Sequence, residues 1–244
     1  MSLRQPKILV YDIESAGVNA FNADLGYVLV FGYIWLSDFE KGKKWKTISI
    51  GDFKRFKKNP HDDTDVIKEA LKILNQADGI IHHYGNKFDA PFLLTRAEIL
   101  RLEGFPDLPM LDTCFLAYKR FKFFSNRLKN IALALKCKYN KIEKNDGWPK
   151  WWLAYLKGDL RYDKKMRKYC GYDVMTLAEI SLRMRKYWPK QFTNRLYSKN
   201  CGRICNSCGS TKLSNNGFTI YRRMIHKKLA CRNCGSRANY EKVE

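Results

Sequence analysis

Two acidic residues in a short N-terminal segment have the spacing of a metal site. Asp12 and Glu14 lie two residues apart in a segment that is predicted to form a strand. Their side chains therefore project from one face, while Ile13 points to the other. Two carboxylates on one face repel each other unless a cation lies between them. The pair is typical of a metal site, although two solvated acids at a sheet edge would give the same spacing.

Asp89 and Asp173 are further candidate ligands, and each also has a structural explanation. Asp89 follows an apolar segment and begins a predicted helix, so its carboxylate is also suited to cap that helix. Asp173 lies inside a long predicted helix, one turn after Tyr169 on the inward face. An inward acid needs a metal or a partner. The alternative is a side chain turned to solvent or paired with Arg167 or Lys168.

Four cysteines near the C-terminal end form two Cys-x-x-Cys-Gly pairs, separated by 22 residues. They are Cys205, Cys208, Cys231 and Cys234. Each pair supplies two thiolates at the spacing of a zinc ribbon, in which four thiolates hold one structural Zn²⁺ in tetrahedral geometry. We therefore predict zinc rather than disulfides, with Cys201 and His226 as weaker alternative ligands.

The remaining cysteines indicate a reducing compartment. Cys114, Cys137 and Cys170 are scattered through apolar or helical segments, as is typical of buried free thiols. We therefore expect a cytoplasmic location, with the nucleoid or a viral replication site as more specific alternatives. No run approaches the ~18 to 20 apolar residues of a membrane span, so no membrane partner is expected.

The charge balance predicts a polyanionic partner. The chain has 46 Lys and Arg residues against 24 Asp and Glu residues, a formal charge of +22 on 244 residues. A composition that is 45% hydrophobic and 14% aromatic excludes a wholly disordered polyelectrolyte. Nucleic acid is the partner that a basic folded surface of this kind favours. An acidic protein, a membrane surface or charge without a specific partner remains the alternative.

Two basic segments are candidate nucleic-acid contacts. Residues 113–142 contain eight basic residues and no acid, interleaved with aromatic residues, and residues 196–244 contain ten basic residues and two acids. The candidate contacts are Lys119, Arg120, Lys122, Arg127 and Lys129 in the first segment and Arg222 and Arg223 in the second. Basic side chains neutralise phosphates, and exposed rings stack on unpaired bases. Core aromatic residues beside a solvated face would give the same pattern.

The apolar periodicity predicts strands first and then strands alternating with helices, which is typical of an α/β domain with a mixed sheet. The predicted strands are 7–13, 27–36, 45–50, 79–84 and a short one at 110–111, and the predicted helices are 64–77, with an N-cap in 62–64, 88–103, 113–119, 127–136 and 163–187. The periodicity fades between Pro189 and Cys201. We therefore expect a larger domain at 1–192 and a zinc ribbon at 193–244.

Three segments occur in the order of the exonuclease motifs of the DEDD superfamily. They are Tyr11–Glu14, His83–Leu93 and Tyr169–Leu177. They look most like the proofreading 3′-5′ exonuclease domains of family B DNA polymerases, of the DEDDy type, in which a Tyr precedes the last Asp by four residues. Phe124–Leu135 is similar to the helix between the second and third motifs. The resemblance covers roughly residues 7–187, and it implies a ribonuclease H-like mixed β-sheet flanked by helices.

The resemblance also implies a chemistry. Four carboxylates of such a site hold two Mg²⁺ or Mn²⁺ ions, which activate a water and stabilise the leaving oxygen of a phosphodiester. It assigns these ligands to Asp12, Glu14, Asp89 and Asp173, with Asp12 as the bridging ligand. It makes Tyr169 the residue that orients the attacking water, because a phenol with a pKa near 10 is a poor base. The implied product is a 5′-mononucleotide released from a 3′ end.

The sequence departs from the family pattern in two places. An Asn usually lies four or five residues before the second-motif Asp, where this chain has Tyr84 and Gly85, and Asn86 is displaced toward Asp89. Asn86 is therefore the candidate contact to the substrate strand in this motif. Nothing similar to a polymerase palm or fingers follows the third motif, so we expect the exonuclease-like part to act alone.

The expected function is a stand-alone exonuclease. The polymerase-like motifs favour single-stranded or frayed DNA over RNA as the substrate. The zinc ribbon is expected to bind nucleic acid or a replication or repair protein, or only to stabilise the larger domain. An exoribonuclease and a non-catalytic nucleic-acid-binding module on the same fold are the two alternatives.

Overall fold

The computed structural model describes residues 5–140, 150–197, 204–205, 207–221, 224–237 and 239–242. Internal contacts divide the chain into two units. One unit is Lys7–Ile180, and the other is Ser181–Glu244 together with Met1–Pro6. The dividing point falls inside a continuous helix, so the domain boundary at residue 192 stays a prediction.

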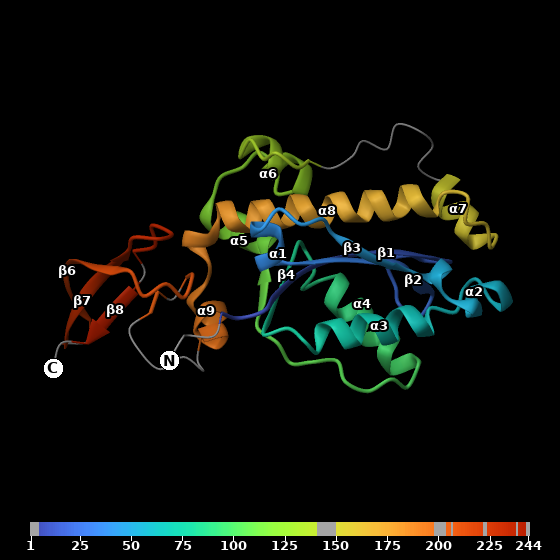
Figure 1. The fold of residues 1–244 in the computed structure, drawn as a ribbon, viewed down its shortest axis with the longest axis horizontal. Coiled ribbons are helices and arrows are strands. Elements are labelled where there is room, and N and C mark those ends of the chain that lie inside the picture. The colour runs from blue at the N-terminus through green and yellow to red at the C-terminus, as the bar shows by residue number, and fades with distance from the viewer. Residues whose placement is uncertain are drawn as a thin grey trace. The chain divides into compact units, whose positions relative to one another are not determined.

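A mixed five-stranded sheet forms the centre of the Lys7–Ile180 unit, as the sequence predicts (Figure 1). The strands are β1 (Ile8–Gly17), β2 (Gly26–Trp35), β3 (Lys46–Ser49), β4 (Gly79–His82) and β5 (Met110–Asp112). Their order is β3-β2-β1-β4-β5, with β1–β2 and β2–β3 antiparallel and β1–β4 and β4–β5 parallel. The apolar strand β1 therefore lies at the centre, between β2 and β4.

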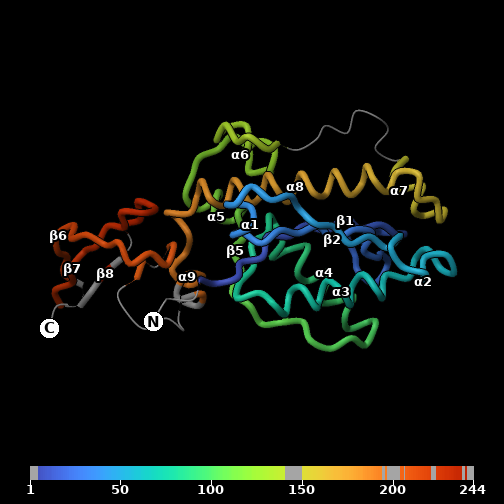
Figure 2. Tube along the Cα trace, viewed as in Figure 1, coloured from blue at the N-terminus to red at the C-terminus, as the bar shows by residue number. Residues whose placement is uncertain are grey.

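Helices cover both faces of this sheet. They are α1 (Leu36–Glu40), α2 (Lys54–Lys58), α3 (Thr64–Leu74), α4 (Asp89–Ile99), α5 (Thr113–Arg120), α6 (Leu128–Ala134), α7 (Lys150–Leu156) and α8 (Asp163–Arg183). In Figure 1, α3 and α4 lie on one side of the sheet and α8 runs along the other. The tube in Figure 2 shows α5 directly after β5 on the α8 side.

The sequence periodicity did not predict several short helices, and it predicted several other helices to be longer than they are. The short helices α1 and α2 and the helix α7 have too few residues for a clear apolar period. The long helix predicted to reach residue 187 ends at Arg183, and a separate 3₁₀ turn spans Arg185–Tyr187. Helix α4 ends at Ile99, before Arg101, which has a left-handed φ of 52°.

Two glycines let α8 pack closely against β2 and against the segment that contains Trp45. A Cβ atom at Gly32, in β2, would lie 2.5 Å from the Sγ atom of Cys170 in α8. A Cβ atom at Gly171 would lie 1.9 Å from Nε1 of Trp45. Neither distance is sterically possible. Because both positions are glycine, the third-motif segment of α8 can approach β2 at the position that pairs with Asp12.

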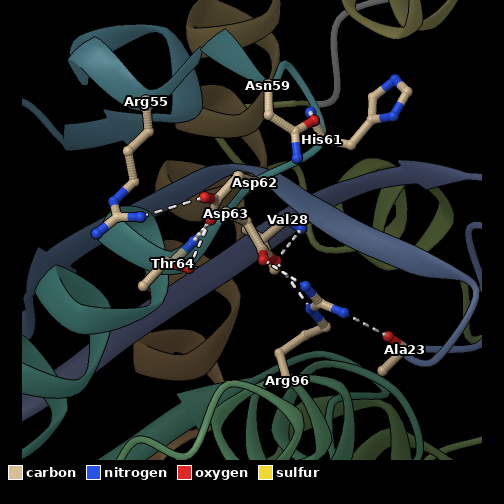
Figure 3. A network of polar contacts seen from close by, with 9 residues as sticks. All are labelled: Ala23, Val28, Arg55, Asn59, His61, Asp62, Asp63, Thr64 and Arg96. Atoms are coloured by element: carbon tan, nitrogen blue, oxygen red, sulfur yellow. Dashed lines mark hydrogen bonds and ion pairs between the residues drawn. The ribbon is translucent and has the colours of Figure 1, made fainter.

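A buried ion pair ties α4 to the rest of this unit (Figure 3). Arg96 donates two hydrogen bonds to Asp63, with Nη2–Oδ1 at 2.6 Å and Nε–Oδ2 at 3.1 Å, and a third to the carbonyl of Ala23. The Val28 N–H also donates to Asp63. The sequence predicted an N-cap for α3 in 62–64, and Asp63 is the N-cap residue, although its side chain makes no cap hydrogen bond and Asp62 accepts the Thr64 N–H at 3.1 Å. Asp63 instead joins α3, α4 and β2.

A second polar network holds the start of α8. Asp163 accepts hydrogen bonds from Ser49, Tyr155 and Arg167, each at 2.6 Å. Arg167 also donates two hydrogen bonds to Asp52. The network therefore connects α7 and α8 to the end of β3, and it fixes the direction in which α8 crosses the sheet.

The Ser181–Glu244 unit contains a short helix and a three-stranded sheet. The helix is α9 (Lys190–Tyr197), and the strands are β6 (Leu213–Tyr221), β7 (Met224–Cys231) and β8 (Asn239–Lys242), all antiparallel. Helix α9 lies where the sequence predicted a fading, linker-like segment, and Phe192 packs edge-on against Trp188 with ring centroids 5.4 Å apart. Among the described helices of both units, none has the length and apolar character to cross a membrane.

Candidate functional site

Asp12 and Glu14 share one face of the central strand. Both side chains are half-buried, whereas Ile13 between them is buried. The β1–β2 register shifts between Glu14 and Ser15, and such a bulge turns the strand just after the acidic pair. The predicted common face of the two acids is therefore present in the structure.

A thiol from α8 joins this pair. The ligand atoms of Asp12, Glu14 and Cys170 all lie within 4.8 Å of one another. Cys170 Sγ is 3.6 Å from the carbonyl oxygen of Asp12 and 3.9 Å from its Oδ2. The sequence analysis assigned Cys170 only as a scattered free thiol. Its position between Tyr169 and Asp173 could have indicated a site residue, but only the close approach of α8 to β1 places the thiol beside the acids.

Asp89 turns toward the same strand and does not act as a side-chain cap. Its Oδ1 accepts the backbone N–H of Ile13 at 3.2 Å, and α4 has Phe88 as its N-cap residue, without a side-chain cap bond. Burial is the main cause that raises the pKa of Asp89 to about 7; the charge of Asp112 adds to the rise, and the hydrogen bond from the Ile13 N–H opposes it. A buried acid aimed at the backbone between Asp12 and Glu14 is a suitable ligand for a cation at this place.

Asp173 and Tyr169 both face inward from α8. Asp173 is 3% exposed and Tyr169 is 2% exposed, so the alternative of a solvent-facing Asp173 is wrong. Arg167 pairs with Asp52 and Asp163, as described above. The Tyr169 ring lies edge-on to the rings of Trp151 and Trp152 in α7, at centroid distances of 6.3 and 6.2 Å.

The four acids lie in one electrostatic neighbourhood, although they do not form one compact ligand group. Burial raises the pKa of the Cys170 thiol, and the charges of Asp12, Glu14 and Asp173 add to this effect. Burial likewise raises the pKa of Tyr11, with additions from Asp89, Asp12 and Asp112. The charge of Asp12 contributes to both of these pKa shifts. Asp89 and Asp173 lie outside the group of ligand atoms within 4.8 Å, so that group contains two of the four candidate acids.

Asp112 shapes the loop that carries the second motif. Its carboxylate accepts the N–H groups of Tyr84 and Asn86, at 3.0 and 3.1 Å, and also those of Cys114 and Phe115 at the start of α5. Tyr84 has a left-handed φ of 63°, a strained conformation that these hydrogen bonds hold. Asp112 was not among the candidate residues from the sequence. Its position at the end of a short strand that runs parallel to β4 could have indicated a functional residue.

Gly85 and His82 explain why the second motif departs from the family pattern. A Cβ atom at Gly85 would lie 2.4 Å from the His82 ring, so no side chain fits there. Burial lowers the pKa of His82, and the neutral ring donates its Nε2–H to Asn86 Oδ1 at 2.8 Å. Asn86 is thus engaged within its own loop, and its contact to a substrate strand stays a prediction.

A cavity of about 400 Å³ adjoins the acidic pair. It is lined by Glu14 and the end of β1, by Phe21 and Phe88, and by Trp152 in α7. The Phe21 and Phe88 rings meet edge-on with centroids 6.1 Å apart, and Trp152 Nε1 donates to the carbonyl of Ser15 at 3.0 Å. Aromatic walls beside carboxylates suit a ligand with a flat ring and a charged group.

The basic segment of α5 and α6 has the exposure that nucleic-acid contact requires. Lys119, Arg120, Lys122 and Arg127 are exposed and Lys129 is half-buried. Tyr118 and Phe124 are 74% and 104% exposed, whereas Leu128 and Ile131 face the interior. The aromatic residues of this segment are therefore not all core residues. Arg222 and Arg223 lie outside the described residues, as do Lys141 and Cys201.

The four cysteines of the two pairs converge. Their Sγ atoms all lie within 4.8 Å of one another, with Cys205–Cys234 at 3.7 Å and Cys208–Cys231 at 3.6 Å. A tetrahedral Zn²⁺ with Zn–S bonds of ~2.3 Å separates its sulfurs by about 3.8 Å. The cluster therefore fits a zinc ribbon, and His226 is not part of it.

The repeated glycine of each pair has a structural reason. Gly209 and Gly235 have φ values of 70° and 71°, and their N–H groups donate to the carbonyls of Cys205 and Cys231. Only glycine adopts this conformation without strain. Each glycine thus closes the turn that brings the two thiols of its pair together.

Comparison with protein families agrees with this architecture. A family model described as the RNase H superfamily matches residues 9–185. The chain belongs to the RNase H superfamily. No curated protein matches the chain closely enough to be named as a relative. Membership of this superfamily fits a nuclease-type fold with a divalent-metal site. The matched segment contains all four candidate acids and Tyr169.

Proposed function

We propose that this RNase H superfamily member is a metal-dependent 3′-5′ exonuclease of the DEDDy type that degrades single-stranded or frayed DNA. The observation that supports the proposal is that Asp12 and Glu14 lie together on β1 and Asp89 accepts the Ile13 N–H between them, while the charge of buried Asp173 acts on Cys170 beside Asp12. The four acids are all oxygen donors, the ligands that Mg²⁺ and Mn²⁺ prefer. Two such ions, when bound, supply an activated water and charge stabilisation at the leaving oxygen.

The chain's own residues have separate tasks in this proposal. Asp12 and Glu14 are half-buried and can meet both an ion and solvent. Buried Asp89 and Asp173 supply ligands from α4 and α8, and Tyr169 orients the attacking water by hydrogen bonding. The cavity beside Glu14 receives the terminal nucleotide, with Phe88 or Trp152 stacking on its base.

The basic surface supports nucleic acid as the substrate. Lys119, Arg120, Lys122 and Arg127 are exposed beside Tyr118 and Phe124, which suits the backbone and bases of a single strand. The zinc ribbon aids this binding or docks on a replication or repair protein.

The decisive experiment compares 3′-tailed DNA and RNA of matched sequence, each incubated with Mg²⁺, Mn²⁺ or EDTA. We expect 5′-mononucleotides from DNA with either ion and none with EDTA. Asp12→Ala and Asp173→Ala should each abolish release, with unchanged circular dichroism. Full activity of both variants would end the two-metal proposal. Faster release from RNA would make the protein an exoribonuclease, and no release from either strand would favour a binding module.

A further inference from the structure

Cys170 adds a soft ligand to a centre that the proposed function fills with hard ions. Its sulfur, one oxygen of Asp12 and one of Glu14 form a group in which every pair of atoms lies within 4.8 Å. Hard ions such as Mg²⁺ bind oxygen and gain little from sulfur, whereas thiolates select Zn²⁺ and similar ions. Mg²⁺ would therefore use the two carboxylates alone, whereas Zn²⁺ or a similar ion would also use the thiolate.

The distances suit a small tetrahedral ion. With Zn–S of ~2.3 Å and Zn–O of ~2.0 Å, a tetrahedral Zn²⁺ separates its sulfur and oxygen ligands by about 3.5 Å. Cys170 Sγ lies 3.9 Å from Asp12 Oδ2. A small side-chain adjustment would thus bring the ligands to the ideal separation, and three protein ligands would leave a fourth position for a water.

The position of the sulfur is constrained by packing. Cys170 is fully buried, and Gly32 leaves just the space that the thiol occupies, since a Cβ there would lie 2.5 Å from Sγ. The thiol therefore stays beside Asp12 and does not turn away, which reduces the ordering cost of binding an ion.

We propose that Asp12, Glu14 and Cys170 form a carboxylate–thiolate site that captures Zn²⁺ or another thiophilic divalent ion, and that this ion inhibits the centre. The thiol proton is released to solvent when the ion binds. Asp12 and Glu14 together balance the charge of one Mg²⁺ ion. With Zn²⁺ the added thiolate leaves an excess negative charge, so the zinc-occupied site repels a phosphodiester more than the magnesium-occupied site does. The inhibition rests on the proposed nuclease function, whereas the capture of the ion does not.

A cadmium titration tests the capture directly. The full chain, with zinc already in its ribbon, is titrated with Cd²⁺ in excess Mg²⁺, and both the ultraviolet cadmium–thiolate absorption and the bound Cd²⁺ per chain are measured. Cys170→Ser is the test variant, and Cys114→Ser, a half-buried thiol in α5, is the matched control. Cd²⁺ exchange into the ribbon is the same in all three proteins and cancels.

We expect the wild type and Cys114→Ser to bind one more Cd²⁺ than Cys170→Ser, with a correspondingly stronger absorption. Asp12→Asn should lose the same ion while its Cys170 and the surrounding core remain, which separates ligand loss from misfolding. Equal absorption and equal stoichiometry in the wild type, Cys170→Ser and Asp12→Asn would overturn the proposal.

Inhibition is a second, independent readout. Nucleotide release is measured in Mg²⁺ against rising Zn²⁺, relative to each variant's own rate without Zn²⁺. The Zn²⁺ concentration for half inhibition should rise at least tenfold in Cys170→Ser and stay unchanged in Cys114→Ser. If no protein releases nucleotides, the proposed function fails, and the cadmium titration still decides whether the site exists.

Discussion

The carboxylate centre and the cysteine cluster gather their ligands in opposite ways. Each cysteine pair is made within one turn, closed by Gly209 or Gly235, and a hairpin joins the two turns. The acids come from β1, α4 and α8, and their approach depends on packing across the whole Lys7–Ile180 unit. The cysteine cluster is therefore a local construction, whereas the carboxylate centre is a product of the tertiary fold.

The strongest test of this difference is removal of zinc. Structural zinc contributes on the order of 10 kcal/mol to the folding of small domains, so chelation or Cys231→Ser should unfold β6–β8. Hydrogen exchange should show lost protection there and retained protection in β1–β5. Cys137→Ser, outside the cluster, serves as the control. Equal loss of protection in both units would show that the cysteine cluster is not local in its effect.

The converse test breaks the packing on which the carboxylate centre depends. Arg96→Met leaves Asp63 buried without its ion-pair partner, which costs about 3 to 5 kcal/mol. Arg55→Met removes exposed ion pairs with Asp62 and Asp65 and should destabilise the chain far less, because solvent screens such pairs. Denaturant unfolding measures both. Zinc binding should be unchanged in either variant, and a small cost for Arg96→Met would weaken the claim of tertiary dependence.

The pH dependence of stability sharpens the comparison at one acid. The pKa of Asp89 is about 7 in the folded chain, against an ordinary value of 3.8 for an aspartate side chain. Between these values the folded state holds a proton that the unfolded state has released, so stability falls as pH rises from about 4 to about 7.

Asp89→Asn removes this effect and keeps an acceptor for the Ile13 N–H. Without divalent ions, the variant should exceed the wild type in unfolding free energy at pH 8, by up to about 4 kcal/mol, and match it near pH 3. Unfolding in urea across this range measures the difference. Added Mg²⁺ should stabilise the wild type more than the variant. A difference independent of pH would contradict the buried, raised pKa.

The smallest expected effect concerns water orientation. Tyr169→Phe keeps the ring edge-on to Trp151 and Trp152 and removes only the hydroxyl. Release of nucleotides should slow ten- to a thousandfold, which corresponds to about 1.4 to 4 kcal/mol. Binding of Mn²⁺, followed by electron paramagnetic resonance, should not change. An unchanged rate would remove Tyr169 from the proposed mechanism.

Sequence reasoning identified the elements that have strong periodicity and missed those whose form depends on context. The strands β1 and β2 and the helix α3 are long and regularly patterned, and the prediction found each of them. The helices α7 and α9 are short, and packing rather than local period stabilises them. The sequence placed Asp63 only within a predicted N-cap segment and left Asp112 unassigned, because their hydrogen-bond partners come from other elements.

The sequence by itself determined the cysteine cluster, because the two thiols of each pair and its turn-forming glycine are neighbours in the chain. It also placed Asp12 and Glu14 on one face, since alternation along a strand requires no other element. Only the tertiary structure decided that Asp89 turns to β1 and does not cap α4, that Asp173 is buried, and that Cys170 lies beside the acids. These choices depend on how closely α4 and α8 approach the sheet, which is set by packing between segments far apart in the sequence.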